Sequence, residues 1–459
     1  MPAVAAFAVI MSGCDLEVQN PGSILDSDLT TPQLMPILVA GVSAEYNDIG
    51  DLYAFSTARL SDDIAGTGSY FGTQQYRQGI FDFEDSSGFW EQAHEAAWSA
   101  GEAWVRLQDV LPDASANALS SRLFMLMGHA HRVLGENFCD LVYDVGTSQA
   151  RSVAFDSAIV AFNMAITIGT AAGSDADEYV MSARAGIAAA MVGLAVHGSG
   201  TWAVAAAQAA LIPTDFVDAA IYHRQANSNQ IWIETHNRAE VGVWGTRAQR
   251  LGDPSLTDPD PRTPYAICGT FDDPSDPSAG VTSTGDCAGS GSGAHQGADG
   301  LTAHYRQDKY PERGSDIPRV SGVEMRMIEA EEALLRDDYA AFIGFINDAR
   351  ASYGRNAADT GDVLPALTAP TTAGSLDWPY DDTLGDGWSI LDEERYATLW
   401  LTGKRWYDLD RWNHPFLDGG FLAPNIPGAS ALARRASCMP VPKNECELNP
   451  NLQGDPICG

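Results

Sequence analysis

Adjacent carboxylates are the first side chains in this sequence that could do chemistry. They occur at Asp62 and Asp63, Glu331 and Glu332, and Glu393 and Glu394. Glycoside hydrolysis needs two carboxylates across a cleft, one with a raised pKa, whereas neighbouring residues on a helix point in different directions. Charge runs are typical of solvated faces, and the sequence contains no serine-hydrolase, zinc-protease, phosphate-loop or dinucleotide motif. These acids therefore predict no catalytic site.

Aromatic side chains in polar segments are the second candidate chemistry, because flat rings can stack on a ligand. The candidates are Tyr70, Phe71 and Tyr76, in a Gly- and Ser-rich stretch, and Trp232 and Trp244 further on. Aromatic residues in such places either anchor a loop on the core or form an exposed stacking platform. Both interpretations stay open from the sequence.

Cysteines offer a third chemistry. Six of them follow the N-terminal region, at Cys139, Cys268, Cys287, Cys438, Cys446 and Cys458. An even number in an exported protein favours disulfides, and the sequence has no Cys-x-x-Cys pair that would indicate zinc. Cys268 and Cys287 flank a loop rich in Gly, Ser and Asp, and Cys446 and Cys458 bracket a polar tail. Cys139 and Cys438 would then pair by elimination. The sequence leaves all 15 connectivities open.

Helical patterns occupy most of the chain that must position these groups. Apolar residues recur at helical spacing in segments 31–60, 90–111, 116–138, 154–170 and 177–213. The last two are rich in Ala and Gly and look like tetratricopeptide-type helix pairs, in which small residues let helices pack closely. We therefore predict a mainly α fold.

Three segments break the helical pattern. Residues 61–89 read as an irregular loop, and residues 253–316 as a long Pro-, Gly- and Asp-rich loop or insertion. Residues 229–246 alternate with period two around a His-Asn-Arg-Ala turn, which predicts a small β-hairpin. Trp232 and Trp244 would lie on its two arms, either lining a binding face or shielding the sheet.

Composition excludes one class of partner. With 459 residues the chain can bury a large core, and its formal net charge is −34. Phosphate backbones need a basic surface, so nucleic acid is not expected, and charge would not draw the protein to anionic lipid.

The N-terminus indicates export. Residues 1–13 contain a short apolar run that ends in small residues before Cys14, as in a signal peptide, and no Lys or Arg precedes it. The alternative is a cytosolic N-terminus with a chance cysteine. No other segment is expected to span a membrane. Residues 14–28 are polar and suit a tether.

The most specific pattern lies at Ile390–Trp412, ILDEERYATLWLTGKRWYDLDRW. It predicts an amphipathic helix, with acids at the front and bases at the back, that runs into a Trp-rich turn. The order E-R-x-x-x-L-x-x-x-G-x-R-W-x-D-L-x-R-W resembles the C-terminal signature of the SusD/RagB family. Met11-Ser12-Gly13-Cys14 resembles the lipidation site of bacterial lipoproteins.

Further landmarks of this family follow in the same order along the chain. They are Asp260-Pro261-Arg262, Lys309-Tyr310, a helical repeat carried by Glu324, Ala330, Glu331, Ile346, Asn347 and Arg350, and a tail carried by Pro440, Pro442, Glu445, Asn449, Pro450 and Asn451. The resemblance thus covers essentially the whole chain.

The resemblance implies a SusD-like α-helical fold, one domain over residues 14–459, and a surface lipoprotein held in the outer membrane by Cys14. It implies a protein that binds glycan or oligopeptide without catalysis or cofactor and passes it to a SusC-type TonB-dependent transporter. Ligand residues of the family lie in variable loops, so the five aromatic candidates come from this sequence alone. The signature residues Arg405, Trp406, Asp408, Arg411 and Trp412 are expected to support the fold. The alternatives are a secreted helical glycan-degrading enzyme and a tetratricopeptide-like adaptor.

Overall fold

The structure is a computed structural model that describes residues 29–273, 276–287, 295–356, 364–380, 385–419 and 434–458. The predicted signal peptide, Cys14 and the tether lie outside the described residues.

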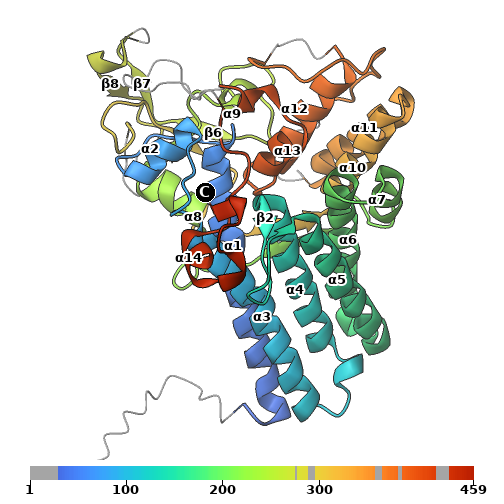
Figure 1. Ribbon diagram of the computed structural model, residues 1–459. Coiled ribbons are helices and arrows are strands. Elements are labelled where there is room, and N and C mark those ends of the chain that lie inside the picture. The colour runs from blue at the N-terminus through green and yellow to red at the C-terminus, as the bar shows by residue number, and fades with distance from the viewer. Residues whose placement is uncertain are drawn as a thin grey trace, which may run out of the picture.

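Long helices form the lower half of the molecule in the view of Figure 1. They are α1 (Met35–Leu60), α3 (Ser87–Val110), α4 (Ala118–Asn137), α5 (Ser152–Ala172) and α6 (Asp177–His197). The shorter α7 (Trp202–Ala209) follows α6 in the chain and lies beside α10 (Gly322–Leu335) in the upper half of the view. Each long helix falls within a few residues of its predicted segment, and segment 177–213 divides into two helices. The mainly α prediction is confirmed.

Two phenylalanine rings set the close spacing of α4, α5 and α6. The Phe162 ring on α5 is fully buried, and a Cβ added at Gly128 on α4 would lie 2.5 Å from it. Gly186 on α6 lies against the same ring. Phe155, two turns earlier on α5, meets Gly193 in the same way. Small residues therefore let these helices approach, as the helix-pair pattern predicted.

Helix α5 and residues 174–197 are long and apolar enough to cross a membrane by length and composition, contrary to the expectation from the sequence. Their apolar faces pack into the bundle core around Phe155 and Phe162. Core helices of soluble proteins share this composition.

Shorter elements form the upper half of Figure 1. The helices there are α2 (Phe71–Gln78), α8 (Gln230–Trp232), α9 (Arg247–Leu251), α10 (Gly322–Leu335), α11 (Tyr339–Asn356), α12 (Gly387–Leu399) and α13 (Arg405–Arg411), and α14 (Lys443–Leu448) lies near the C-terminus. Small antiparallel sheets connect them.

The described residues form five two-stranded sheets. They pair β1 (Ala65–Gly66) with β5 (Val241–Gly242), β2 (Asp140–Leu141) with β3 (Gln149–Ala150), β4 (Val217–Ala220) with β10 (Ile317–Ser321), β6 (Tyr265–Ile267) with β9 (Tyr305–Gln307), and β7 (Gly269–Phe271) with β8 (Val281–Ser283). Residues 61–89, expected to be irregular, contain β1 and α2.

The hairpin predicted for residues 229–246 is wrong. The segment begins as α8 and continues as a π-helix at Ile233–Asn237, and only β5 pairs, with the distant β1. The Asn229 side chain accepts a hydrogen bond from the Trp232 amide at 2.9 Å and caps the helix. The Asp51 carboxylate accepts another from the Gln230 amide. Over so short a segment, these hydrogen bonds at the helix start favour a helix more strongly than period-two alternation favours a strand.

The signature segment forms two helices instead of one. Helix α12 ends at Leu399, and a turn with positive φ at Leu401 (58°) and Gly403 (77°) leads into α13. A Cβ at Gly403 would lie 3.1 Å from the Ala54 backbone on α1, so only glycine suits this turn and this approach. Trp400 and Trp406, on either side of the turn, are fully buried.

Three disulfides form among the described residues, and they join the two pairs that spacing favoured and the third pair that remained by elimination. Cys268 bonds Cys287, and Cys446 bonds Cys458. The third joins Cys139, at the end of α4, to a residue 299 positions later, Cys438. The backbone agrees, since the Cys139 amide donates to the Met439 carbonyl at 2.9 Å.

Candidate functional site

The signature segment is a junction of buried ion pairs rather than a solvated charged face. Asp392 on α12 bonds both Arg405 on α13 and Arg247 on α9. Arg405 also meets Asp62, with Nε 2.6 Å from Oδ1 and Nη2 2.9 Å from Oδ2. Burial would raise the pKa of Asp62, but the Arg405 guanidinium outweighs it and lowers that pKa. These acids balance buried arginines and are unavailable as catalysts.

Other landmarks of the resemblance meet at the same place. Arg262 lies 2.7 Å from Glu394 on α12, which also bonds Arg350 on α11. Arg411 on α13 holds Glu331 on α10 through two contacts of 2.5 and 2.8 Å. We call this set of pairs, centred on α12 and α13, the signature junction. It ties the loops at Asp62 and Arg262 to helix α12 and helix α13.

Tyr70 and Phe71 form the most exposed of the predicted aromatic sites. They lie at the start of α2, with 56% and 78% of their surfaces exposed. The pairing of β1 with β5 fixes the preceding loop, and the Thr67 amide donates to Glu240 O at 2.9 Å. Two adjacent exposed rings on a held loop can stack on a flat apolar ligand surface.

Tyr76, predicted as a third member of this platform, is instead a core residue. It is only 7% exposed, on the inner face of α2, and its ring packs against Phe81 at a centroid distance of 5.4 Å. Helical periodicity turns it away from Phe71, so it cannot contact a ligand without unfolding α2.

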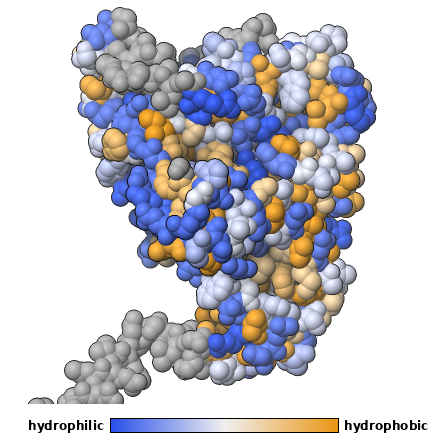
Figure 2. Space-filling model, in the orientation of Figure 1, coloured by the Kyte–Doolittle hydropathy of each residue, from blue (hydrophilic) through white to orange (hydrophobic). Residues whose placement is uncertain are grey.

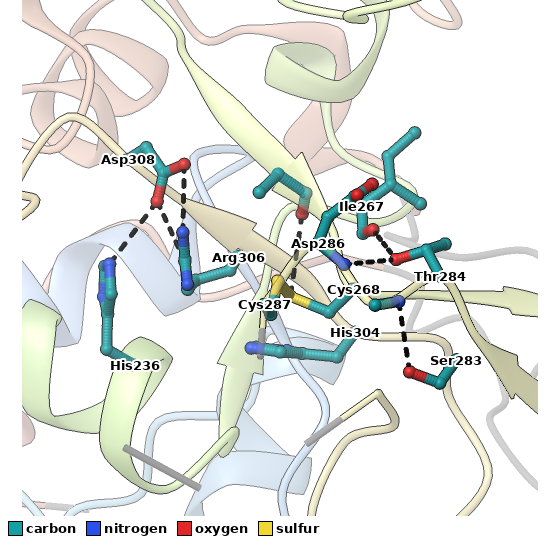
Figure 3. Close-up of a disulfide and its surroundings, with 12 residues drawn as sticks. His236, Ile267, Cys268, Ser283, Thr284, Asp286, Cys287, His304, Arg306 and Asp308 are labelled. Carbon is teal, nitrogen blue, oxygen red and sulfur yellow. Dashed lines mark hydrogen bonds and ion pairs between the residues drawn. A yellow bond between two sulfur atoms is a disulfide. The ribbon is translucent and has the colours of Figure 1, made fainter. Parts of the chain in front are cut away.

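Trp232 is half-buried and held by protein contacts. Its ring stacks on His236 at 5.3 Å, and its Nε1 donates to the Pro311 carbonyl at 3.2 Å. Figure 3 shows why His236 is held in turn: Asp308 faces both His236, at 3.4 Å, and Arg306, at 2.9 Å, beside the Cys268–Cys287 disulfide. Trp232 therefore braces the loop-rich segment and presents only part of its surface.

Trp244 follows β5 and packs against Phe271 at a centroid distance of 5.0 Å, where it shields the small sheet β7–β8. Among the described residues, no ring contact joins Trp244 or Trp232 to the exposed pair at α2. The sequence candidates thus separate into an exposed pair, two half-buried tryptophans and one core tyrosine.

A large cavity, about 1620 Å³, lies between loop 250–265, α11 and α12. The charged residues that line it include Arg250, Arg262, Glu393 and Glu394, which pair with one another or with neighbours. The main role of these charged side chains is therefore to form ion pairs within the protein, at and beside the signature junction.

A smaller open pocket of about 400 Å³ is lined by Trp202, Trp388 and Trp412. The sequence did not reveal it, because the three tryptophans come from α7, α12 and the end of α13 and show no common spacing. Glu331 and Arg411 also line it.

Figure 2 shows the surface of the same view, where hydrophobic residues are scattered among hydrophilic ones. Such scattering is usual for a protein surface. Individual exposed aromatic residues in the loop-rich half therefore indicate a binding site better than the amount of apolar surface does.

Comparison with known proteins supports the fold. No model of a protein family matches the sequence, and no curated protein matches it either. Solved structures do. A SusD homolog from Parabacteroides distasonis has 14% identity and a TM-score of 0.62, with 93% of this chain and 95% of that chain covered.

Two Bacteroides proteins give similar results. A SusD-like protein from Bacteroides fragilis has 12% identity and a TM-score of 0.59, over 92% of this chain and 96% of that one. A SusD-like carbohydrate-binding protein from Bacteroides vulgatus has 13% identity and the same TM-score, over 93% and 98%. The chain therefore has the SusD-like fold that its sequence landmarks predicted.

Proposed function

We propose that the protein binds a glycan outside the cell and passes it to a SusC-type TonB-dependent transporter of the outer membrane. The mature chain would begin at Cys14 and be anchored there by lipid. The observation that carries this proposal is the exposed pair Tyr70 and Phe71 on a SusD-like fold. Carbohydrate binding is also named for the similar protein from Bacteroides vulgatus.

The physical fit is direct. A pyranose ring has an apolar C–H face and hydroxyl edges, so it stacks on aromatic rings and bonds to nearby polar groups. Gln74 and Gln75, one turn along α2, hold the platform in place: the Gln74 amide donates to the Gly68 carbonyl, and the Gln75 amide donates to Asp82 at 3.0 Å. A net charge of −34 favours a neutral ligand over an acidic one.

Binding without catalysis is the activity that fits this site. The buried carboxylates Asp62, Asp392 and Glu394 are each paired with arginine. Removing a carboxylate from such a pair would leave a buried arginine without its partner, so the main effect would be a loss of stability.

The test is a glycan array and affinity gel electrophoresis with wild type, Tyr70→Ala and Phe71→Ala. Trp98→Ala is the matched control, because Trp98 is 65% exposed but lies on α3 in the helical bundle. We expect each platform variant to bind about tenfold more weakly and the control to bind as wild type. Unchanged glycan binding in the Tyr70 and Phe71 double variant would contradict the assignment of the site to this pair, and binding of oligopeptides alone would contradict a glycan ligand.

The transporter and the anchor need separate tests. Cys14→Ser should move the protein from the outer-membrane fraction to a soluble one. Wild type should copurify with a large TonB-dependent barrel. If Cys14→Ser remained in the membrane fraction, the anchor assignment would be wrong even if glycan binding were intact.

A further inference from the structure

Three tryptophans from distant parts of the chain meet at one open pocket. Trp202 begins α7, Trp388 lies in the first turn of α12, and Trp412 follows α13. The rings of Trp388 and Trp412 form an edge-to-face pair at 6.1 Å and 78°. All three are partly exposed, so the indoles are accessible from the pocket. Its volume of about 400 Å³ is in the range of small-molecule sites.

One ion pair lines the wall of this pocket. Arg411 bonds both oxygens of Glu331, and Trp412 Nε1 donates to Glu331 Oε1 at 2.7 Å. The Arg411 guanidinium also lies 4.5 Å from the centre of the Trp412 ring and 5.7 Å from that of Trp202. Because these contacts fix both side chains, the wall is ordered before a ligand arrives.

The same contacts limit what can bind. An aromatic cage often holds a cation, but the Arg411 cation already occupies two of the three rings. An anion would need a free positive charge, yet Glu331 neutralises Arg411. A ligand with apolar faces and uncharged hydrogen-bonding edges suits three indoles around a neutral ion pair.

We propose that this pocket, lined by Trp202, Trp388 and Trp412, is a second saccharide site that takes one or two neutral sugar units. It is distinct from the platform at Tyr70 and Phe71, since it is built from α7, α10, α12 and α13 and not from α2 or β5. The proposal shares the ligand class of the proposed function but stands on other residues. Either site can fail while the other holds.

Trp388→Ala removes one wall of the pocket, and Trp388→Phe restores an aromatic ring. Leu335→Arg is a second variant, because Leu335 lines the pocket and is 47% exposed, so we expect the longer side chain to obstruct the pocket while the protein stays folded. The control is Trp98→Ala. Thermal unfolding of each variant verifies that it is folded.

The probes are neutral gluco-, manno-, xylo- and galacto-configured tetrasaccharides, with choline and glucuronate as charged comparisons. Binding is followed by calorimetry and tryptophan fluorescence, in wild type and in a Tyr70→Ala, Phe71→Ala background. We expect at least one neutral tetrasaccharide to bind in that background. Trp388→Ala and Leu335→Arg should weaken this binding about tenfold, and Trp388→Phe should recover part of it.

Three results would overturn the proposal. They are no binding of any neutral probe in the platform-deficient background, equal binding in folded Trp388→Ala and Leu335→Arg, and choline or glucuronate binding as strongly as the sugars. If glycan binding were lost only in the platform variants, the proposed function would stand and this second site would not.

Discussion

The helical bundle and the signature junction hold their elements together by different forces. In the bundle, the buried rings of Phe155 and Phe162 lie against glycines of neighbouring helices. In the junction, buried arginines from α9, α11 and α13 meet carboxylates of α12 and of Asp62. The first depends on shape and the second on charge.

This difference teaches which region can change without unfolding the protein. Apolar packing loses free energy in proportion to the volume that is changed, whereas a buried ion pair that loses one partner leaves an uncompensated charge. Single substitutions in the signature junction should therefore destabilise the fold most, because they release the loops that the junction holds.

The largest effect is expected at Arg405, which serves both Asp62 and Asp392. Arg405→Ala should lower the free energy of unfolding by ~3–5 kcal/mol, because two buried carboxylates lose their cation. Denaturant unfolding measures this. Arg336→Ala is the control, since Arg336 pairs with Glu332 while 53% exposed and should leave stability unchanged. Equal effects of the two changes would remove the distinction between junction and surface.

The next effect is expected in the bundle. Gly193→Ala would place a Cβ 2.5 Å from the Phe155 ring and should destabilise the protein by ~1–3 kcal/mol through overpacking. The same unfolding experiment checks it. A Gly193→Ala variant as stable as wild type would show that α5 and α6 can separate freely, against the shape-based account of the bundle.

A smaller effect concerns pH at Asp51, which accepts hydrogen bonds from the Gln230 amide and has no arginine or lysine ion pair in the described part of the chain. Burial raises the pKa of Asp51 to about 8. The folded state therefore holds this proton more tightly than the unfolded chain, and its stabilisation is present below about pH 4 and lost as pH rises toward 8. Asp51→Asn should raise Tm by a few degrees at alkaline pH and little at about pH 5.

The dependence of stability on pH has the opposite sign at the signature junction. Burial would raise the pKa of Asp392, but Arg247 and Arg405 hold it well below its usual range, so its stabilisation is lost only as pH falls.

If Asp51→Asn gave the same Tm profile as wild type between about pH 5 and 9, burial would not control the Asp51 carboxyl.

The smallest effect is a gain. Gly41 lies in α1, and a Cβ there would meet nothing within 4 Å. Gly41→Ala should stabilise the protein by ~0.4–1 kcal/mol, because alanine loses less backbone entropy in a helix. A loss of stability in this variant would show that Gly193→Ala does not report on Phe155 alone.

The sequence predicted the helical half well, because periodicity is a local signal. Helices α1, α3, α4 and α5 begin and end near their predicted bounds, and the Ala- and Gly-rich segments pack as closely as expected. The landmarks of the C-terminal half also predicted the fold class.

The sequence was less informative where partners are distant. Asp62 and Arg405 are 343 residues apart, so the acid pairs could not be recognised as buried from their local pattern. Tyr76 looked like Tyr70 until α2 placed it on the inner face. The predicted hairpin failed because period-two alternation does not reveal the helix cap that the Asn229 side chain forms.

The Cys139–Cys438 disulfide has a consequence for a protein exposed to proteases. It closes α5 through α13, and the long loop around exposed Leu256, into one covalent ring. A single cut in that loop opens the ring but releases no fragment, because both pieces remain attached through sulfur. A nicked molecule would run as one chain until it is reduced, so α4 and the C-terminal tail would stay joined to the same molecule after such damage.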